Sequence, residues 1–294
     1  MNTLVFGGTG KVGSVAVRHL AEKGFQVKVF SHSPEKLVSL PNNVQSVIGD
    51  LDQKQTILSA MDAIDTIILI LGVHPSEEER GLAIIDAAKK ANVKRIVSLS
   101  LVHSPGTEHV AFYRSKLAIE GAFKNSDMHW SIIRSSSFFQ SDALLKNDIV
   151  DKGIFSAPIG SLGVNRIDTR DVGYAMAEAV IMPSSESQEF RIFGPEPLTG
   201  DSIASIYTHL LGREIRYGGD DLEEWAEFKK DGFVPWSLTA LRTMYGCVQK
   251  NGMKPEPGET KSHLLPDKMI TFETFASELT NSWNSSTGNK KVTV

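Results

Sequence analysis

Residues 3–24 of this chain, TLVFGGTGKVGSVAVRHLAEKG, contain the signal that decides its fold. The apolar run at residues 3–6 is typical of a buried parallel strand. Glycines crowd the next residues, and apolar side chains then recur at helical spacing until Gly24, which is placed to end the helix. Glycines between a strand and a helix are the context of a dinucleotide-binding turn. The stretch therefore predicts a strand–turn–helix unit that binds a nucleotide.

Each glycine of this turn has an expected role. Gly7 permits a tight turn, Gly10 lets the backbone approach a pyrophosphate, and Gly13 lets the helix pack close to the strand. The pyrophosphate charge would meet free N–H groups at the helix N-terminus. The spacing is Gly-x-x-Gly-x-x-Gly and not the usual Gly-x-Gly-x-x-Gly, so a glycine-rich turn without a ligand is the alternative. The residues assigned to this part of the cofactor are Gly7, Thr9, Gly10, Lys11, Val12 and Gly13.

The composition excludes several classes of function. The 294 residues are 41% hydrophobic and 22% charged, and the formal net charge of −4 provides no basic surface for nucleic acid. The single cysteine, Cys247, cannot form an internal disulfide and favours a reducing compartment. No apolar run reaches membrane-spanning length, no signal-peptide pattern opens the chain, and no His and Cys spacing resembles a metal site. We expect a cytoplasmic globular protein with a small-molecule substrate and no direct nucleic-acid, membrane or metal partner; a homodimer is compatible with these features.

The segment after the second expected strand, residues 26–30, decides which dinucleotide binds. An acid at the strand end would bind the ribose 2′-hydroxyl of NAD, whereas a basic residue would accept a 2′-phosphate. No acid closes this strand, and His32, Ser33 and Lys36 could face a phosphate, which favours NADP(H) over NAD(H). The alternative is an ordinary helix start, with Ser33 as the N-cap before Pro34.

Two further strand ends are expected near the nucleotide. Asp50 and Leu51 follow a strand at residues 44–48 and would contact the adenine side; alternatively, Asp50 caps a helix over residues 53–61. The apolar run at residues 65–71 predicts a strand covered on both faces, with Leu71 and Gly72 next to the cofactor. Helix 77–91 and strand 95–100 continue the alternation. The pattern predicts an α/β, doubly wound parallel sheet with ligands beyond the carboxyl ends of its strands.

Beyond a helix at residues 109–124 and a strand at residues 129–134, the pattern is less regular. Trp225, Phe228 and Trp236 are spaced as plain helical core, with the wall of an aromatic substrate pocket as the alternative. Cys247 has no partner pattern and is expected as a packed thiol. The polar residues 284–294 are expected to be disordered. The other elements expected are residues 154–158, 164–167, 171–181, 189–193, 201–211 and 214–217.

Several motifs in their order resemble the atypical short-chain dehydrogenase/reductase superfamily, and within it the NmrA-like group, which also holds NADPH-dependent quinone reductases. The motifs are GGTGKVG at 7–13, SPEK at 33–36, Gly49-Asp50, Lys116 with Glu120, IDTRDV at 167–172, and GPE at 194–196 before Leu198-Thr199. The resemblance implies a Rossmann NAD(P)-binding domain over residues 1–135 and a smaller, discontinuous substrate lobe over residues 136–283, with about residues 171–212 returning to the core. It also implies that Lys116 binds the nicotinamide ribose.

The chain departs from the pattern of this superfamily at its catalytic pair, Tyr-x-x-x-Lys. There the tyrosine donates a proton while hydride arrives, and the lysine lowers the tyrosine pKa. Here Phe112 lies four residues before Lys116, and Tyr113 lies about a quarter of a turn away from the required position. Ser135 and Ser136 replace the Pro and Gly expected after Arg134, and His32 takes the place of the basic residue for the 2′-phosphate.

Candidates for the remaining chemistry follow the strand ends. Ser100 matches the active-site hydroxyl position and could hydrogen-bond a substrate carbonyl; a serine that merely ends a strand is the alternative. His74 and His103 should rim the cleft, where either could replace the tyrosine as proton donor or be an ordinary loop histidine. Asp171 is interpreted as a helix cap and Arg170 as an ion-pair partner across the domain. The catalytic assignments are Lys116, Ser100 and His103.

These observations favour an NADPH-dependent oxidoreductase that acts on a small quinone or carbonyl-type substrate. A quinone is already electrophilic, so its reduction tolerates a missing tyrosine better than ketone reduction does. Two alternatives stay open: a non-catalytic NADP-binding redox sensor of the NmrA type, and an isomerase or cyclase that reuses the fold.

Overall fold

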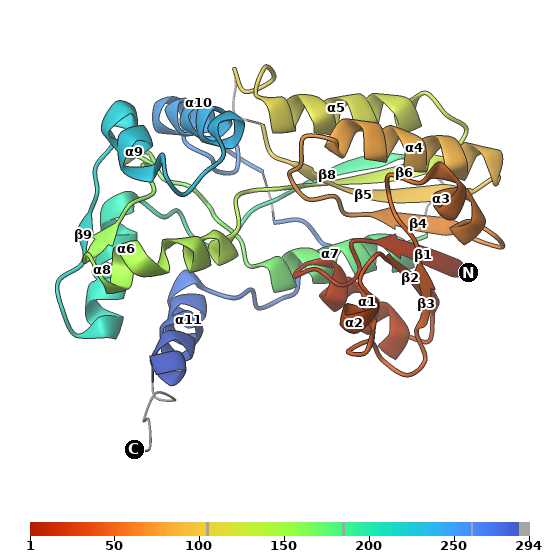
Figure 1. The fold of residues 1–294 in the computed structure, drawn as a ribbon, viewed down its shortest axis with the longest axis horizontal. Helices are drawn as coiled ribbons and strands as arrows, with labels where there is room; N and C mark the ends of the chain where they lie inside the picture. The colour runs from red at the N-terminus through yellow and green to blue at the C-terminus, as the bar shows by residue number, and fades with distance from the viewer. Residues whose placement is uncertain (104–105, 184–185, 260, 288–294) are drawn as a thin grey trace.

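The computed structural model describes residues 1–103, 106–183, 186–259 and 261–287. A parallel sheet of seven strands forms its centre, in the order β3-β2-β1-β4-β5-β6-β8 (Figure 1). This order confirms the predicted doubly wound sheet, with the change of direction between β1 and β4. The strands are β1 (Asn2–Phe6), β2 (Gln26–Ser31), β3 (Gln45–Ile48), β4 (Thr66–Leu69), β5 (Arg95–Leu101), β6 (His129–Ser135) and β8 (Gln188–Ile192).

Helices cover both faces of the sheet because its strands are apolar on both sides. On one face lie α1 (Gly13–Glu22), the short α2 (Pro34–Leu37) after β2, and α7 (Thr169–Ile181). On the other face lie α3 (Lys54–Ala60), α4 (Glu77–Lys90) and α5 (Ala111–Lys124). Gly24 has φ +82° directly after the last turn of α1 and ends that helix as predicted.

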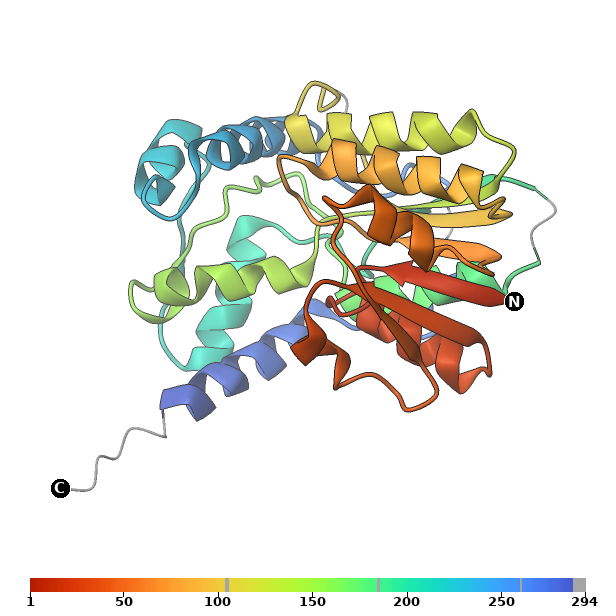
Figure 2. The same ribbon diagram turned by 45° about the vertical axis from the view of Figure 1, so that its right-hand side comes forward.

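A second group of elements lies beside the carboxyl ends of the strands, opposite the amino end of β1 (Figures 1 and 2). It packs around its own apolar core, in which Phe139, Phe155, Tyr207 and Phe272 are buried. α7 and β8 return to the main sheet, whereas α8 packs in this second core. Its elements are η1 (Phe139–Leu145), α6 (Lys146–Val150), β7 (Ile154–Phe155), α8 (Gly200–Leu211), β9 (Arg216–Tyr217), α9 (Leu222–Lys229), α10 (Pro235–Asn251) and α11 (Phe272–Thr287).

Several predictions for this region were wrong. Within the described residues, 164–167 form isolated bridges, to residues 138, 198 and 253, and pair with no continuous strand. The expected disordered tail overlaps α11, which continues to Thr287; residues 288–294 lie outside the described part of the chain. Trp225 is buried as core, but Phe228 is 41% and Trp236 37% exposed. The ring of Phe228 lies against the ammonium groups of Lys152 and of the buried Lys229, a cation–π arrangement that holds it at this position.

The start of α7 differs from its prediction as well. Asp168 is the cap, with its side chain accepting a hydrogen bond from the Arg170 N–H at 2.8 Å, and Asp171 lies inside the first turn. There the Asp171 carboxylate accepts a hydrogen bond from the Ile270 N–H at 3.0 Å. Arg170 forms the predicted ion pair across the molecule, at 2.8 Å from Glu278 of α11.

Candidate cofactor and substrate site

The turn after β1 can be built only from glycine at two positions. Gly7 has φ +80°, and a Cβ atom on it would overlap the carbonyl group of Ile70 at the end of β4. A Cβ atom on Gly13 would overlap the carbonyl group of Gly7. The Gly10 N–H closes the turn by donating to the Gly7 carbonyl oxygen at 3.0 Å. Strand, turn and helix therefore touch backbone to backbone.

At the start of α1, this packing leaves backbone N–H donors that have no acceptor in the described part of the chain. Within the described residues, the N–H groups of Lys11, Val12 and Gly13 donate to no protein acceptor, and the first turn of α1 holds no acidic residue. Free N–H groups at the positive end of a helix suit an anion such as a pyrophosphate. The turn thus fits the group that the sequence assigned to it.

A cavity of about 340 Å³ lies beside the turn, where the carboxyl ends of β1, β2 and β4 meet the first turn of α4. The predicted cofactor residues that line it are Gly7, Thr9, His32, Ser33, Lys36, Leu51, Leu71 and Gly72. The predicted residues outside its lining are Gly10, Lys11, Val12, Gly13, Asp50 and Lys116. Lining residues that the sequence assigned no cofactor role are Phe6, Phe30, Ser31, Ile70, Val73, His74, Glu77 and Arg80.

The end of β2 presents hydroxyl and basic groups to this cavity. His32 and Lys36 are exposed, and the Ser31 hydroxyl accepts a hydrogen bond from the Ser33 N–H at 3.1 Å. Ser33 occupies the N-cap position before Pro34, but its side chain makes no capping hydrogen bond. The lip of the cavity therefore carries donors for a phosphate.

Arg80 of α4 lines the cavity, whereas Asp50 lies outside its lining, next to Leu51. Asp50 does not cap α3: Gln53 is the N-cap there, and the Asp50 carboxylate instead accepts from the Asp52 N–H at 2.9 Å. Asp52 in turn binds the guanidinium of Arg80 through both oxygens, each at 2.7 Å. This bidentate pair fastens the loop after β3 to α4. Sequence spacing carried no signal for it, because the two residues meet only in the fold.

Lys116 is buried and held by two acceptors. Its ammonium nitrogen lies 2.6 Å from the Glu77 carboxylate of α4 and 3.0 Å from the Leu71 carbonyl oxygen at the end of β4. Glu77 is only 1% exposed, and this burial raises the pKa of its carboxyl, partly offset by Lys116. The pair fixes Lys116 against the wall of the cavity.

The two aromatic residues before Lys116 are also buried. Phe112 and Tyr113 pack together with Ala240 of α10, and the Tyr113 ring lies against His103 with centroids 5.6 Å apart. Burial raises the pKa of the Tyr113 hydroxyl well above its ordinary value. The hydroxyl of Tyr113 is thus held inside the protein, three residues before Lys116 on the same helix.

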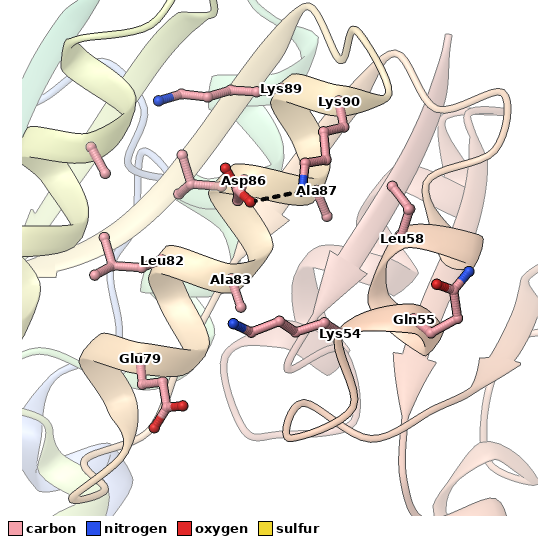
Figure 3. A pocket seen from close by; sticks show the side chains of 12 residues that line it. Lys54, Gln55, Leu58, Glu79, Leu82, Ala83, Asp86, Ala87, Lys89 and Lys90 are labelled. Atoms are coloured by element: carbon pink, nitrogen blue, oxygen red, sulfur yellow. Dashed lines mark ion pairs between the residues drawn. The ribbon is translucent and has the colours of Figure 1, made fainter.

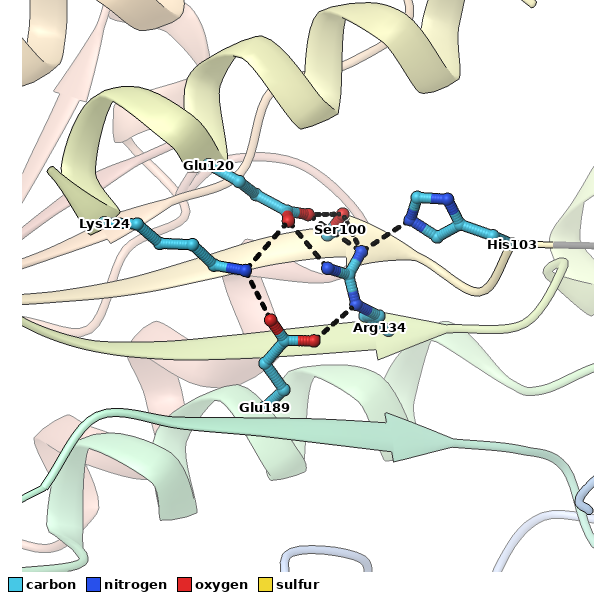
Figure 4. A network of polar contacts seen from close by, with 6 residues as sticks. All are labelled: Ser100, His103, Glu120, Lys124, Arg134 and Glu189. Carbon is cyan, nitrogen blue, oxygen red and sulfur yellow. Dashed lines mark hydrogen bonds and ion pairs between the residues drawn. The ribbon is translucent and has the colours of Figure 1, made fainter. Parts of the chain in front are cut away.

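Ser100 belongs to a polar network at the carboxyl ends of β5 and β6 (Figure 4). Its hydroxyl donates a hydrogen bond to the Glu120 carboxylate at 2.5 Å. The same carboxylate accepts hydrogen bonds from both terminal nitrogens of the Arg134 guanidinium, at 2.9 and 2.7 Å. The Arg134 Nε donates to Glu189 of β8 at 3.0 Å. Ser100 is 1% exposed, so its hydroxyl proton is committed inside the protein.

His103 lies at the outer end of the same network. Its Nε2 is 2.6 Å from the Arg134 Nη1, and its ring is half-buried. Burial, followed by the charge of Arg134, lowers the pKa of this imidazole despite the nearby carboxylates. His74 instead rims the cofactor cavity, where its Nδ1 accepts from the Ser76 N–H at 3.0 Å.

A larger hollow of about 570 Å³ lies outside the helix layer, between α3 and α4 (Figure 3). Its rim mixes Lys54, Lys89 and Lys90 with Glu79 and Asp86, and Lys90 pairs with Asp86 at 3.1 Å. Ligands of open α/β sheets bind at the carboxyl ends of the strands, where the order reverses. The cavity beside Gly7 satisfies that condition and the α3–α4 hollow does not.

None of the helices in the described part of the chain combines the length and the apolar composition of a membrane span. The same residues contain no cluster of three or more His, Cys, Asp or Glu side chains that could hold a metal ion.

The sheet order, the glycine turn and the cavity beside it together define a Rossmann-type dinucleotide-binding fold. The NmrA-like family model matches residues 2–276, and the chain belongs to the NmrA-like family. This confirms the resemblance that the motifs indicated.

Individual relatives include enzymes and a regulator. The chain is 29% identical over 247 residues to the NAD(P)H azoreductase of Xenophilus azovorans, covering 83% of this chain and 86% of that protein. The NADPH-dependent quinone oxidoreductase of Escherichia coli, solved with NADPH, superposes with a TM-score of 0.86 at 19% identity, covering 95% of this chain and all of that one. The negative transcriptional regulator NmrA, solved with NADP, gives 0.75 at 16% identity, with 98% of each chain covered. The predicted cofactor is thus the one that these two neighbouring structures hold.

Proposed function

We infer that this protein is an NADPH-dependent reductase that transfers a hydride to a small quinone or carbonyl-type acceptor. One observation carries the proposal: free N–H groups at the start of α1 adjoin a cavity that His32, Ser33 and Lys36 line at the end of β2, with Glu35 of α2 outside its lining. An anion site next to a basic and hydroxyl-rich lip suits a dinucleotide with a 2′-phosphate.

The residues present fit NADPH along its length. The turn from Gly7 to Gly13 would hold the pyrophosphate, the β2 lip would hold the 2′-phosphate, and Leu51 would adjoin the adenine side, with Asp50 behind it. Leu71, Gly72 and Lys116 would adjoin the nicotinamide ribose. When bound, this cofactor supplies the hydride, and the chain supplies orientation and electrostatics.

The absence of a tyrosine proton donor limits the classes of substrate that could accept the hydride. Phe112 cannot donate a proton, and Tyr113 is buried, packed with Phe112 and with Ala240 of α10. A ketone reduced without a proton donor would become a strongly basic alkoxide, whereas a reduced quinone is a weak base that water can protonate. The enzymatic relatives, an azoreductase and a quinone oxidoreductase, support an acceptor of this kind.

Stopped-flow absorbance of NADPH, followed with a panel of quinones and simple ketones, tests the proposal. We expect oxidation of NADPH with quinones and little with ketones. The absence of turnover with every quinone and carbonyl acceptor would overturn the proposed reductase.

A redox sensor is the second candidate, and one observation favours it. Lys116 already has two protein partners, Glu77 and Leu71, and the residue four positions before it is Phe112. A site of this kind could bind NADP without turning it over, as a regulator would. Tight NADP binding without turnover, together with a protein partner that dissociates in one redox state, would support the sensor over the enzyme.

A further inference from the structure

Six charged or polar side chains from five segments meet beyond the cofactor cavity, at the carboxyl ends of β5 and β6. They are Ser100, His103, Glu120, Lys124, Arg134 and Glu189 (Figure 4). Arg134 is the centre of this network, because its Nε donates to Glu189, both of its terminal nitrogens donate to Glu120, and Nη1 also contacts His103. Glu120 and Glu189 outweigh the burial of this guanidinium and raise its pKa. Arg134 is therefore a fixed cation at the end of β6.

The contact between Arg134 and His103 determines where the imidazole carries its proton. A guanidinium has N–H donors only and stays charged in proteins. The 2.6 Å contact from Arg134 Nη1 to His103 Nε2 therefore requires a lone pair on Nε2. The proton of a neutral His103 then lies on Nδ1. A second proton, on Nε2, would place an N–H group of a charged imidazole directly against an N–H group of the charged Arg134 guanidinium, which is unfavourable.

We propose that Arg134 is a positioning residue that holds His103 as the neutral Nδ1–H tautomer, so that His103 serves as an uncharged hydrogen-bond donor to the substrate oxygen and not as the proton source. This inference rests on the proposed reductase function. It changes the role expected for His103 from the sequence. An uncharged imidazole can polarise a carbonyl oxygen without transferring its proton.

Charged side chains face His103 from several of the elements around it. Arg134 faces it from β6, Glu120 from α5, Glu189 from β8 and Glu108 from the segment before α5. The Tyr113 ring covers one side. The three carboxylates favour an imidazolium, whereas burial and the directly bonded Arg134 oppose it and prevail.

This role favours quinone-like acceptors as the substrate class. Addition of a hydride to a quinone oxidises the dinucleotide by two electrons and leaves a hydroquinone anion, to which water then gives one proton. A neutral Nδ1–H stabilises the anionic oxygen through a hydrogen bond, and no protein group has to be reprotonated afterwards. A simple ketone would require a proton in the same step, which neither His103 nor Tyr113 supplies.

The tautomer can be measured without any catalysis, by long-range proton–nitrogen correlation spectra of the full chain labelled with ¹⁵N-histidine. His103 is assigned by the signal lost in His103→Gln, and exposed His129 at the opposite end of β6 serves as the internal reference. We expect a single neutral form of His103 with the proton on Nδ1, and its protonation only at a pH below the ordinary histidine range, because burial and Arg134 lower the pKa of this imidazole. An Nε2–H tautomer, or an imidazolium that forms near the ordinary histidine pKa, would overturn the proposal.

A variant of Arg134 tests whether this residue determines the tautomer and the titration of His103. In Arg134→Gln the neighbouring cation is removed, and we expect His103 to become protonated at a higher pH than in the unchanged chain. Retention of the original tautomer and titration in a folded Arg134→Gln protein would contradict the role of Arg134. The spectrum of the unchanged chain tests the tautomer even where this variant fails to fold.

Kinetics test the role toward the substrate. Glutamine can still donate a hydrogen bond, so His103→Gln should lose less of the quinone reductase kcat than His103→Leu, for which we expect a loss of about ten- to hundredfold with the KM for NADPH unchanged. Equal losses in both variants, or a wild-type rate that rises as His103 gains a proton, would contradict the proposal. If the chain reduces no quinone, the proposed function fails while the spectra still decide the tautomer.

Discussion

A methyl group at position 13 has no room, because a Cβ atom there would overlap the backbone of Gly7 and Gly8. We predict that Gly13→Ala lowers the free energy of unfolding by about 1 to 3 kcal/mol and weakens NADPH binding at least tenfold, about 1.4 kcal/mol. Urea denaturation and titration calorimetry measure the two effects. Gly121→Ala on α5 is the control: nothing lies near its Cβ position, so the same change should stabilise the helix. An unaffected Gly13→Ala protein would show that the turn is not closely packed.

Substitutions of Lys36 and His32 test whether the protein prefers NADPH to NADH through these two side chains. Both are exposed at the β2 lip of the cavity, where a 2′-phosphate would lie. We predict that Lys36→Ala and His32→Ala each weaken NADPH binding about three- to tenfold, while NADH binding changes little. Parallel titrations with the two dinucleotides measure this. A loss that is equal for NADPH and NADH would place the 2′-phosphate elsewhere.

Lys116 has a structural role besides the one expected toward the cofactor. Lys116→Met leaves the Glu77 carboxylate buried without its cation, so we predict a loss of about 3 kcal/mol in the free energy of unfolding. Adding Glu77→Gln should restore more than half of that loss. Lys90→Met is the matched control, since its pair with Asp86 is exposed and contributes about 0.5 kcal/mol or less. If the double variant were no more stable than Lys116→Met, the buried charge would not be the cause.

At the level of elements, the connection into α11 depends on the first turn of α7. Asp171 holds the Ile270 N–H just before α11 begins, and burial raises the pKa of its carboxyl to about 6. Arg170 beside it pairs with Glu278 within α11. The first turn of α7 therefore contacts both the residue before α11 and a side chain within that helix.

The raised pKa of Asp171 predicts a pH dependence of stability. In the folded protein this carboxyl binds its proton more tightly than in the unfolded chain, so its stabilising contribution is complete below about pH 4 and is lost as the pH rises through about 6. Asn keeps the acceptor for Ile270 but cannot titrate. We predict that the stability of the unchanged chain relative to Asp171→Asn rises by about 1 to 2 kcal/mol from pH 7 to pH 4, after allowance for solvent screening. Melting temperatures at several pH values measure the difference, and a constant or opposite difference would contradict the raised pKa.

Across the whole molecule, the sheet and the cofactor turn were predictable because their signals are local. The apolar run before Gly7 and the glycine spacing after it specify a strand, a turn and a helix without reference to distant residues. The second core was not predictable in this way, since Phe139, Phe155, Tyr207 and Phe272 come from elements far apart in the chain. Phe228 and Trp236 have the spacing of core residues, yet they lie at the surface.

In the candidate site, too, some residues were predictable from local sequence and others were not. The residues of the β1 turn and the β2 lip follow strand ends directly, so the order of the strands locates them. The partners of Lys116 and His103 are Glu77 and Arg134, which lie on other elements and meet them only after folding. The sequence could thus indicate a cofactor ligand or a rim histidine, but not the groups that fix its charge.

We expect the turn after β1 and the lip of β2 to hold a dinucleotide with a 2′-phosphate. Titration calorimetry of the full chain with NADPH and NADH in the same buffer measures this binding. We predict one saturable site with NADPH bound at least about tenfold more tightly than NADH. No heat with either dinucleotide, or tighter binding of NADH, would show that no such site exists.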